Sequence, residues 1–452
     1  MGYHEQHCQI CGISFNIGRI RRQGEPESAA WQYYHDDFIT LGDVEDDPLD
    51  EGCSNVPRVP GTTDMDLIEH IAGPNCTCTL GYSGWRITAE EMQERLQCQC
   101  LAPKQEGWQP EPGDEEFEIE AQHCWLTGIS KQGTIEFEVE GLEPVRHGLG
   151  STEIDNSSRE GTSLDGDYAL PIHPHCFVMY TRMSKEKLGK VDIDGLWRLR
   201  ETAGNYQTRF MDFPRRCDVD EVSEQWHNCV PGTEYLASDP LHVSGLEDML
   251  TSCEDEISTA TDVVFEARVS ASDGSDPFVQ LSPELRHMLF PYLDRSDVAN
   301  MRLASRGFGQ LPQTYFHQLI SFDMPWLWEV EFMKDKIMDW HALWRKLSAA
   351  DGGSDVDDKE RKRWHDTLAE KYAGLQEEVN RESLAYASVE WFKRWDTIHD
   401  EALAETEAID EVGMWPARKT GELRGLRNRR RIWGDLEEIM RRIARLPPDE
   451  EA

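Results

Sequence analysis

Residues 276–322 hold a series of short amphipathic patterns, and this series constrains the fold of the chain more than any other segment. Ser282 followed by Pro283 is typical of a helix start, with an N-cap and then a proline at the first helical position. Apolar residues then recur at helical spacing and form one stripe: Leu285, Met288, Leu289 and Leu293. A second stripe follows an expected N-cap at Ser296: Val298, Met301 and Leu303. Helices this short need another surface to cover their apolar residues.

The order of residue types in this segment resembles the F-box. The family pattern opens with Leu-Pro or a close variant, continues with spaced leucines and an aspartate-led turn, and ends in a run like Leu-Ala-Ser-Arg-x-Phe. The matching residues here are Leu281, Pro283, Leu285, Leu289, Leu293, Asp297, Val298, Leu303, Ala304, Ser305 and Phe308. Ser282, between Leu281 and Pro283, is a common variant of the pattern.

The resemblance implies docking onto the Skp adaptor of an SCF ubiquitin ligase. The residues expected to bind that partner are Leu281, Pro283, Leu285, Leu289, Leu293, Val298, Met301 and Leu303. The alternative is an ordinary helical hairpin inside a larger core, which helical periodicity alone would favour.

The composition limits the class of protein. The chain has 452 residues, enough for two or three domains. It carries 86 acidic against 46 basic side chains, and this net charge of −40 disfavours binding to nucleic acid or to anionic membranes. We find no run of about 18 apolar residues and no secretory signal pattern, so we expect no transmembrane helix. We therefore expect a cytoplasmic and/or nuclear protein whose 12 cysteines are metal ligands or buried thiols.

Four regions follow from the local patterns. Residues 1–235 are rich in Cys, Gly and Pro and predict an α+β domain, with strands at 117–120 and 135–140 and a helix at 192–200. Thr88 and Glu91 form a predicted capping box. Residues 236–275 are expected to link this domain to the F-box at 276–322, and they include a short helical pattern at 246–256. The rest, 323–452, is predicted to be all-α, with helices over 325–347, 359–374, 382–411 and 423–446.

Two cysteine motifs far apart in the chain predict a metal site. Cys8-x-x-Cys11 followed by Gly12 is typical of a zinc knuckle, in which a tight turn presents two thiolates to one ion. His173-x-x-Cys176 has the spacing of the second half of a treble-clef or LIM-like site. Together these residues predict a structural zinc ion with three cysteine ligands and one histidine ligand, and His175 could replace His173. The alternative is reduced thiols and a buried histidine without metal.

A second group of cysteines is less informative. Its members are Cys53, Cys76, Cys78, Cys98, Cys100 and the pair His123–Cys124. Two Cys-x-Cys pairs could share an ion, but buried thiols are the simpler interpretation. The chain lacks H-E-x-x-H, G-x-S-x-G, a P-loop and a dinucleotide-binding glycine motif, so we expect no catalytic activity.

Two further patterns allow a functional interpretation beside a structural one. Trp340 and Trp344 share a helical face that is either core or a surface for a degron. The basic run over 424–431 could be a nuclear-import signal, but in so acidic a chain we expect ion pairs within the molecule.

The chain as a whole resembles a group of F-box-containing proteins from filamentous fungi. The similar segments are CQICGISFNIGRIR at 8–21, HIAGPNC at 70–76, GYSGWRIT at 81–88, LPIHPHCF at 170–177, DMPWLWE at 323–329 and GLRNRRRIW at 425–433. The resemblance implies a Cys-rich N-terminal domain, an F-box and a helical C-terminal region, and it implies no particular substrate.

These observations predict a multidomain α+β protein that acts as a substrate-recognition adaptor of an SCF-type ubiquitin ligase. Its expected partners are the Skp adaptor, the cullin scaffold and an unknown protein substrate. One alternative is a zinc-stabilised interaction scaffold without ligase association, in which the chain itself covers Leu285, Leu289 and Leu293. The other is a metalloenzyme, which requires a zinc ion with an open fourth position.

Overall fold

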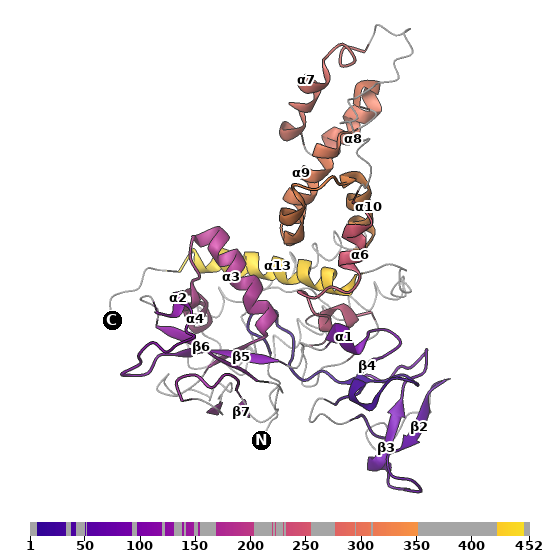
Figure 1. Cartoon of the computed structure of the whole chain (residues 1–452), viewed down its shortest axis with the longest axis vertical. Helices are drawn as coiled ribbons and strands as arrows, with labels where there is room; N and C mark the ends of the chain where they lie inside the picture. The colour runs from indigo at the N-terminus through magenta and orange to yellow at the C-terminus, as the bar shows by residue number, and fades with distance from the viewer. Residues whose placement is uncertain are drawn as a thin grey trace, which may run out of the picture. The chain divides into compact units, whose positions relative to one another are not determined.

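The structure is a computed structural model of the whole chain (Figure 1). It describes residues 7–32, 38–41, 50, 52–92, 97–119, 123–130, 138–139, 142–148, 152–153, 169–202, 219, 222, 229, 232–254, 276–293, 295–308, 311–350 and 423–446. The helices expected over 359–374 and 382–411, and most of the expected linker, lie outside these residues.

Contacts divide the chain into two units. Among the described residues, unit 1 combines those between 7 and 243 with 424–446, and unit 2 combines those between 244 and 350 with Leu423. These bounds differ from the expected ones at both ends of segment 276–322. The reason is that the last helix packs against the N-terminal region, whereas residues 323–350 pack with segment 276–322.

The described residues of unit 1 form four small sheets. The largest has the order β6-β5-β9, with β5 (Cys98–Pro103) antiparallel to both β6 (Cys124–Ser130) and β9 (Leu170–Ile172). Leu101 lies opposite Leu126 on one side and Leu170 on the other, and all three are buried. The other pairs are β1 (Arg19–Ile20) with β4 (Tyr82–Ser83), β2 (Ser54–Pro57) with β3 (Ile68–Ile71), and β7 (Glu138–Val139) with β8 (Thr152–Glu153).

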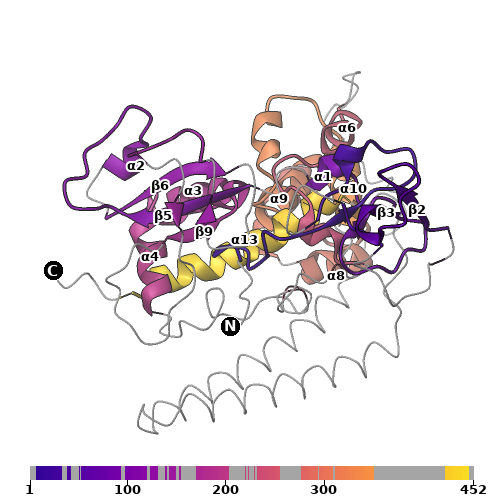
Figure 2. The same cartoon turned by 90° about the horizontal axis from the view of Figure 1, so that it is seen from below.

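Helices surround these sheets. They are η1 (Glu27–Ala29), η2 (Met65–Leu67), α1 (Ala89–Met92), α2 (Glu116–Ile119), α3 (Pro174–Leu188), α4 (Ile193–Thr202), η4 (Glu234–Ala237) and α13 (Arg424–Ile443). α13 contacts α3, α4 and η4, and Figure 2 shows it passing along this part of unit 1. The long C-terminal helix therefore completes the core of the N-terminal region.

The local predictions have mixed outcomes in unit 1. The capping box is confirmed, because the side chain of Glu91 accepts the backbone N–H of Thr88 and Thr88 Oγ1 accepts that of Glu91. The helix expected at 192–200 is α4. The strand expected at 117–120 is wrong, because the structure has α2 there. Glu118 explains the difference: its carboxylate accepts the backbone N–H of Glu115, which closes the first turn of a helix. Of the strand expected at 135–140, the structure describes only β7.

Arginines of the basic run over 424–431 make contacts within unit 1. Arg424 pairs with Glu91 at 2.8 Å, and Arg431 pairs with Asp435 at 3.1 Å. Arg429 is fully buried and donates to the backbone carbonyl of Pro240 at 2.5 Å. The expected ion pairs within the molecule are therefore confirmed for Arg424 and Arg431, whereas Arg429 bonds to the backbone.

Unit 2 is built from short helices. They are α6 (Leu246–Thr251), α7 (Pro283–His287), η5 (Phe290–Tyr292), α8 (Arg295–Ala304), η6 (Arg306–Phe308), α9 (Gln313–Asp323), η7 (Trp328–Met333) and α10 (Trp340–Ala350). Its interior is aromatic: the ring of Phe290 lies 5.9 Å from that of Phe308 and 4.9 Å from that of Tyr315. The Trp340 and Trp344 rings contact His317 and Phe316, so both belong to this packing.

The helix expected over 325–347 is interrupted. Residues 328–333 form η7, and α10 begins only at Trp340. Asp339 accounts for this new start, because its side chain accepts the backbone N–H of Ala342 in the manner of an N-cap. Among the described helices of both units, none combines the length and apolar character that crossing a membrane requires.

Candidate metal centre

The two predicted cysteine motifs meet beside β9. Residues 8–12 form a tight turn in which Gly12 N–H donates to the Cys8 carbonyl at 2.8 Å and Gly12 has a φ of 72°. The turn is fixed next to β9 because Gln9 N–H donates to the Pro171 carbonyl at 2.9 Å. His173 is the N-cap of α3, and Cys176 lies in the first turn of that helix. A loop and a strand-to-helix junction thus supply two donors each.

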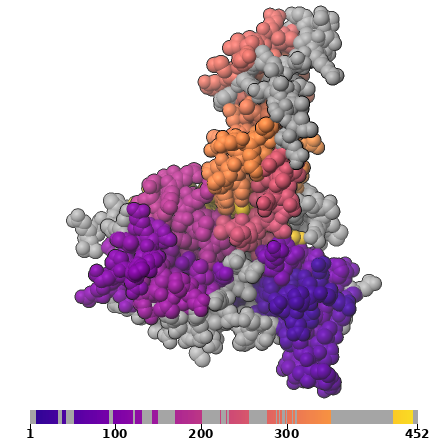
Figure 3. Space-filling view, in the orientation of Figure 1, coloured from indigo at the N-terminus to yellow at the C-terminus, as the bar shows by residue number. Residues whose placement is uncertain are grey.

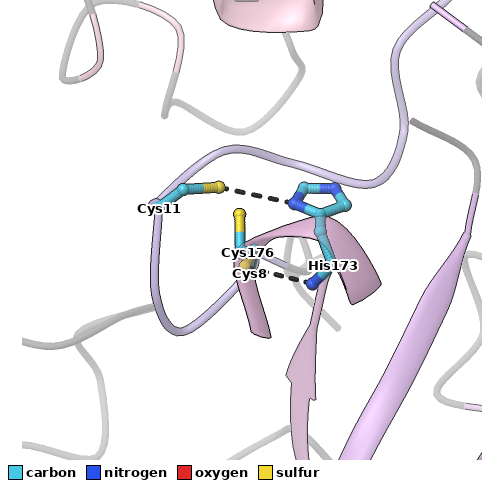
Figure 4. Close-up of side chains that lie close together, drawn as sticks. All are labelled: Cys8, Cys11, His173 and Cys176. Carbon is cyan, nitrogen blue, oxygen red and sulfur yellow. Dashed lines mark hydrogen bonds between the residues drawn. The ribbon is translucent and has the colours of Figure 1, made fainter. Parts of the chain in front are cut away.

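The four predicted ligands come together as one buried group. The thiols of Cys8, Cys11 and Cys176 and a ring nitrogen of His173 all lie within 4.8 Å of one another. Cys11 Sγ is 3.4 Å from His173 Nδ1, and Figure 4 shows the side chains directed toward a common centre. His175 does not belong to the group. Its ring stacks on that of His173 at 5.0 Å between centroids.

Hydrogen bonds donated to a cysteine sulfur atom favour its ionised form, which is the form that binds a metal ion. Cys8 Sγ accepts the backbone N–H of His173 at 3.2 Å. Burial raises the pKa of Cys8 to about 12 and raises that of Cys176 as well. Burial also opposes ionisation of Cys11, but hydrogen bonds from the other two thiols and the nearby His173 bring its pKa well below the usual range. Of the three thiols, Cys11 therefore ionises most readily, and binding a cation would stabilise all three as thiolates.

Arg431 of α13 adds a positive charge to this site. Its guanidinium donates to the Cys11 carbonyl at 2.8 Å and is held by Asn428 and Asp435. Burial alone would lower the pKa of Arg431. The opposing effect of Asp435 and of the thiols of Cys11 and Cys176 is larger, so the pKa is raised and the guanidinium remains charged. Three thiolates and an imidazole around a divalent ion carry a net charge of −1, which this arginine offsets. The sequence predicted ion pairs for the run but not this partner, because 420 residues separate the two.

The donor set indicates the kind of metal and its role. Thiolate sulfur with one imidazole suits zinc better than the hard cations, which prefer oxygen. All four donors come from the chain and all are buried, so they form a closed site. A closed four-donor site is typical of structural rather than catalytic zinc.

The second group of cysteines is only partly brought together. Cys53 and Cys76 lie within 4.8 Å of each other and of His70, which the sequence analysis did not include. Cys98 and Cys100 lie on β5, with sulfur atoms 3.9 Å apart, and Cys124 begins β6. No disulfide joins any of the described cysteines. The sequence feature that could have identified His70 is the segment HIAGPNC at 70–76, in which a histidine and a cysteine lie on either side of Gly73 and Pro74.

The residues expected to bind the Skp adaptor divide into three classes. Leu285 is 50% exposed and Leu303 is 88% exposed. Four are half-buried: Leu281, Leu289, Leu293 and Met301. Val298 is buried inside unit 2, and Pro283 begins α7. The sequence analysis did not include Tyr292, which is 86% exposed, among the binding residues.

Comparison with known proteins was made for the whole chain. No protein-family model matches it, and neither the curated proteins nor the solved structures give a match.

Proposed function

We propose that this protein is a substrate-recognition adaptor of an SCF-type ubiquitin ligase and that unit 2 docks on the Skp adaptor. The observation that carries the proposal is the exposure of large apolar side chains on short helices that already have their own core. Met288 is 65% exposed and lies three residues from Leu285, so the two share one face of the α7 segment. Figure 3 shows the atoms of α7 and α8, in salmon, at the surface.

The energetic argument favours a partner for this surface. Burying a large apolar side chain completely contributes roughly 1.5–3 kcal/mol. Leu285, Met288, Tyr292 and Leu303 together offer several such contributions. Phe290 and Phe308 are buried and hold the helices in place, so a partner would meet a surface that is already ordered.

In this proposal the protein performs no chemistry of its own. The cullin scaffold would bring a charged ubiquitin-conjugating enzyme, and a bound substrate would present its lysine at high effective concentration. Unit 1, stapled by a zinc ion at Cys8, Cys11, His173 and Cys176, would hold the substrate. Such a complex works in the cytoplasm or the nucleus.

A zinc-stabilised interaction scaffold without ligase association is the second candidate. The burial of Val298 and the half-burial of Leu289 and Leu293 favour it, because part of the expected contact surface is used by unit 2 itself. The two candidates differ in one measurable property, which is binding to the Skp adaptor.

The test is binding of the full chain to purified Skp adaptor. We expect the double variant Leu285→Glu/Met288→Glu to bind at least about tenfold more weakly than wild type. Phe332→Glu is the matched control, because Phe332 is 76% exposed in unit 2 but lies outside the F-box segment. Circular dichroism would check that both variants fold. Failure of the wild-type chain to bind, or equal binding by the double variant, would leave the scaffold as the better description.

A further inference from the structure

We infer that unit 1 contains a second metal site, in which Cys53, His70 and Cys76 bind a zinc-type divalent ion and Cys78, which packs against the small cluster that includes Cys76, supplies the fourth donor. The site is independent of the proposed ligase function. It also differs from the group considered in the sequence analysis, because it excludes Cys98, Cys100 and the pair His123–Cys124 and includes His70.

The geometry is close to that of a bound ion. The three donor atoms lie within 4.8 Å of one another, and one ring nitrogen of His70, Nε2, is 3.5 Å from Cys76 Sγ. Zinc–sulfur and zinc–nitrogen bonds of about 2.3 and 2.0 Å place tetrahedral ligands roughly 3.5–3.8 Å apart. The sulfur–nitrogen pair already has this separation. Cys53 Sγ, at most 4.8 Å from each of the other two donors, needs to move by only about 1 Å to close around an ion.

His70 is a buried side chain whose hydrogen bonding is incomplete. Nε2 contacts the Cys76 thiol, whereas Nδ1 is buried and has no hydrogen-bond partner in the described part of the chain. A buried polar atom without a partner costs free energy. An ion bound by Nε2 and the two thiols would replace the weak thiol–imidazole contact with a metal–ligand bond, whereas Nδ1, on the other side of the ring, would not gain a partner from it.

The backbone brings the donors together through two glycines. A side chain at Gly73 would place its Cβ 2.3 Å from the backbone of Gly52, so only glycine allows the two loops to pass so closely. The close passage lets Gly73 N–H donate to Cys53 Sγ at 3.2 Å. The backbone N–H of Cys78 likewise donates to the thiol of Cys76. Cys8 in the first site receives the same kind of bond from His173.

The position of the site gives it a structural purpose. Cys53 directly precedes β2, and His70 lies in β3 opposite Asn55. An isolated two-stranded sheet is marginally stable, and the apolar cluster beside it is small: Ile20, Ile39, Ala72 and Cys76, with Cys53, Cys78 and Leu80 packed around it. Figures 1 and 2 both show β2 and β3 apart from the β5–β6–β9 sheet. A metal ion would fasten the end of this hairpin to the loop after β3.

The first test counts zinc ions in the purified full chain by elemental mass spectrometry. We expect two per chain in wild type and one in Cys76→Ser and in His70→Ala. Cys78→Ser should bind the second ion at least about tenfold more weakly. Cys98→Ser is the matched control, since Cys98 is a buried thiol outside both groups, and it should retain two ions. One ion in wild type, or two in Cys76→Ser, would overturn the proposal, and unchanged affinity in Cys78→Ser would remove that residue from the site.

A second test uses the wild-type chain and so does not depend on folding of a variant. Cys53 is half-buried, whereas Cys8 and Cys11 are fully buried, so a chelator should empty the second site first. We expect alkylation of Cys53 and Cys76 to accelerate at chelator concentrations that leave Cys8 and Cys11 protected, and added zinc to restore protection. Alkylation of Cys53 at the same rate with and without chelator would contradict the inference.

Discussion

Unit 1 buries charged side chains and thiols in its interior, whereas the interior of unit 2 is mainly aromatic. Large apolar side chains reach 88% exposure in unit 2, at Leu303, but at most 60% among the described residues of unit 1, at Val145. In unit 1, Glu118 is fully buried and pairs with Arg146 at 2.8 Å, and Arg429 is fully buried against backbone carbonyls. In unit 2, Phe290, Phe308 and Tyr315 pack ring against ring.

The difference has a physical origin. Buried charges and thiols are tolerated only where specific partners hold them, so unit 1 depends on a few strong, directional contacts. Packing of rings is less directional, so unit 2 depends on the total apolar area that it removes from water. Unit 1 should therefore unfold when one metal ligand is removed, and unit 2 should unfold when a core aromatic side chain is truncated. This contrast can be tested by separate variants.

The largest expected effect is that of Cys8→Ser. Losing one of four ligands should release the metal ion and destabilise unit 1 by more than about 4 kcal/mol. Hydrogen exchange read by mass spectrometry, together with zinc content, would measure this for each unit separately. Protection in unit 2 should remain, and Cys98→Ser should keep the metal. A stable unit 1 in Cys8→Ser would mean that its core does not depend on ligation.

The matching variant in unit 2 is Phe308→Ala. Phe308 is fully buried, with its ring centroid 5.3 Å from that of Phe278, so truncation should cost about 3–5 kcal/mol. The same exchange experiment should show loss of protection in unit 2 at unchanged zinc content. Phe332→Ala, at an exposed position, serves as the control. Loss of zinc in Phe308→Ala would show that the two units are not energetically separate.

The third prediction concerns pH. With the metal site empty, burial holds the pKa of Cys8 at about 12 and raises that of Cys176, so both thiols carry protons at neutral pH. A metal ion must displace these two protons, so its affinity should rise by about 100-fold per pH unit near neutrality. Competition with a chromophoric chelator at several pH values would give the slope. A pH-independent affinity would exclude these thiols as ligands.

The smallest effect is expected for Arg431→Gln. Removing the charge beside the Cys11 carbonyl should weaken metal binding by about 10–100-fold, as for other groups that contact a ligand residue. Arg431→Lys should recover part of the affinity. Arg441→Gln, on the same helix but paired with Glu438 at the surface, should change little. If Arg431→Gln binds metal as wild type does, the arginine only fastens α13.

Short-range signals in the sequence predicted short-range features well. The motifs Cys8-x-x-Cys11 and His173-x-x-Cys176 each place two donors within one turn, so the first metal centre could be assembled from them. The capping box of Thr88 and Glu91 is local for the same reason. The helix at 116–119 was missed because apolar and acidic residues alternate there, as they do in a strand. The helix start depends instead on the carboxylate of Glu118, which accepts the backbone N–H of Glu115.

Features that depend on distant parts of the chain could not be predicted. His70 and Cys53 approach each other only because two glycine-containing loops cross. The membership of α13 in unit 1 depends on packing against α3, α4 and η4, which no local pattern specifies. The exposure of Leu303 and the burial of Val298, five residues apart on one helix, likewise depend on how the helices of unit 2 pack.

The bond between Arg431 and the turn at Cys11 has a consequence for synthesis on the ribosome. Cys11 must wait for His173, 162 residues later, and Arg431 follows Cys11 by 420 residues. All of segment 276–322 of unit 2 is translated between those two events. During synthesis the thiol group of Cys8, Cys11 and Cys176 therefore exists before Arg431 is available, and the helices of unit 2 can fold in this interval. The core of unit 1 is completed only after α13 has left the exit tunnel.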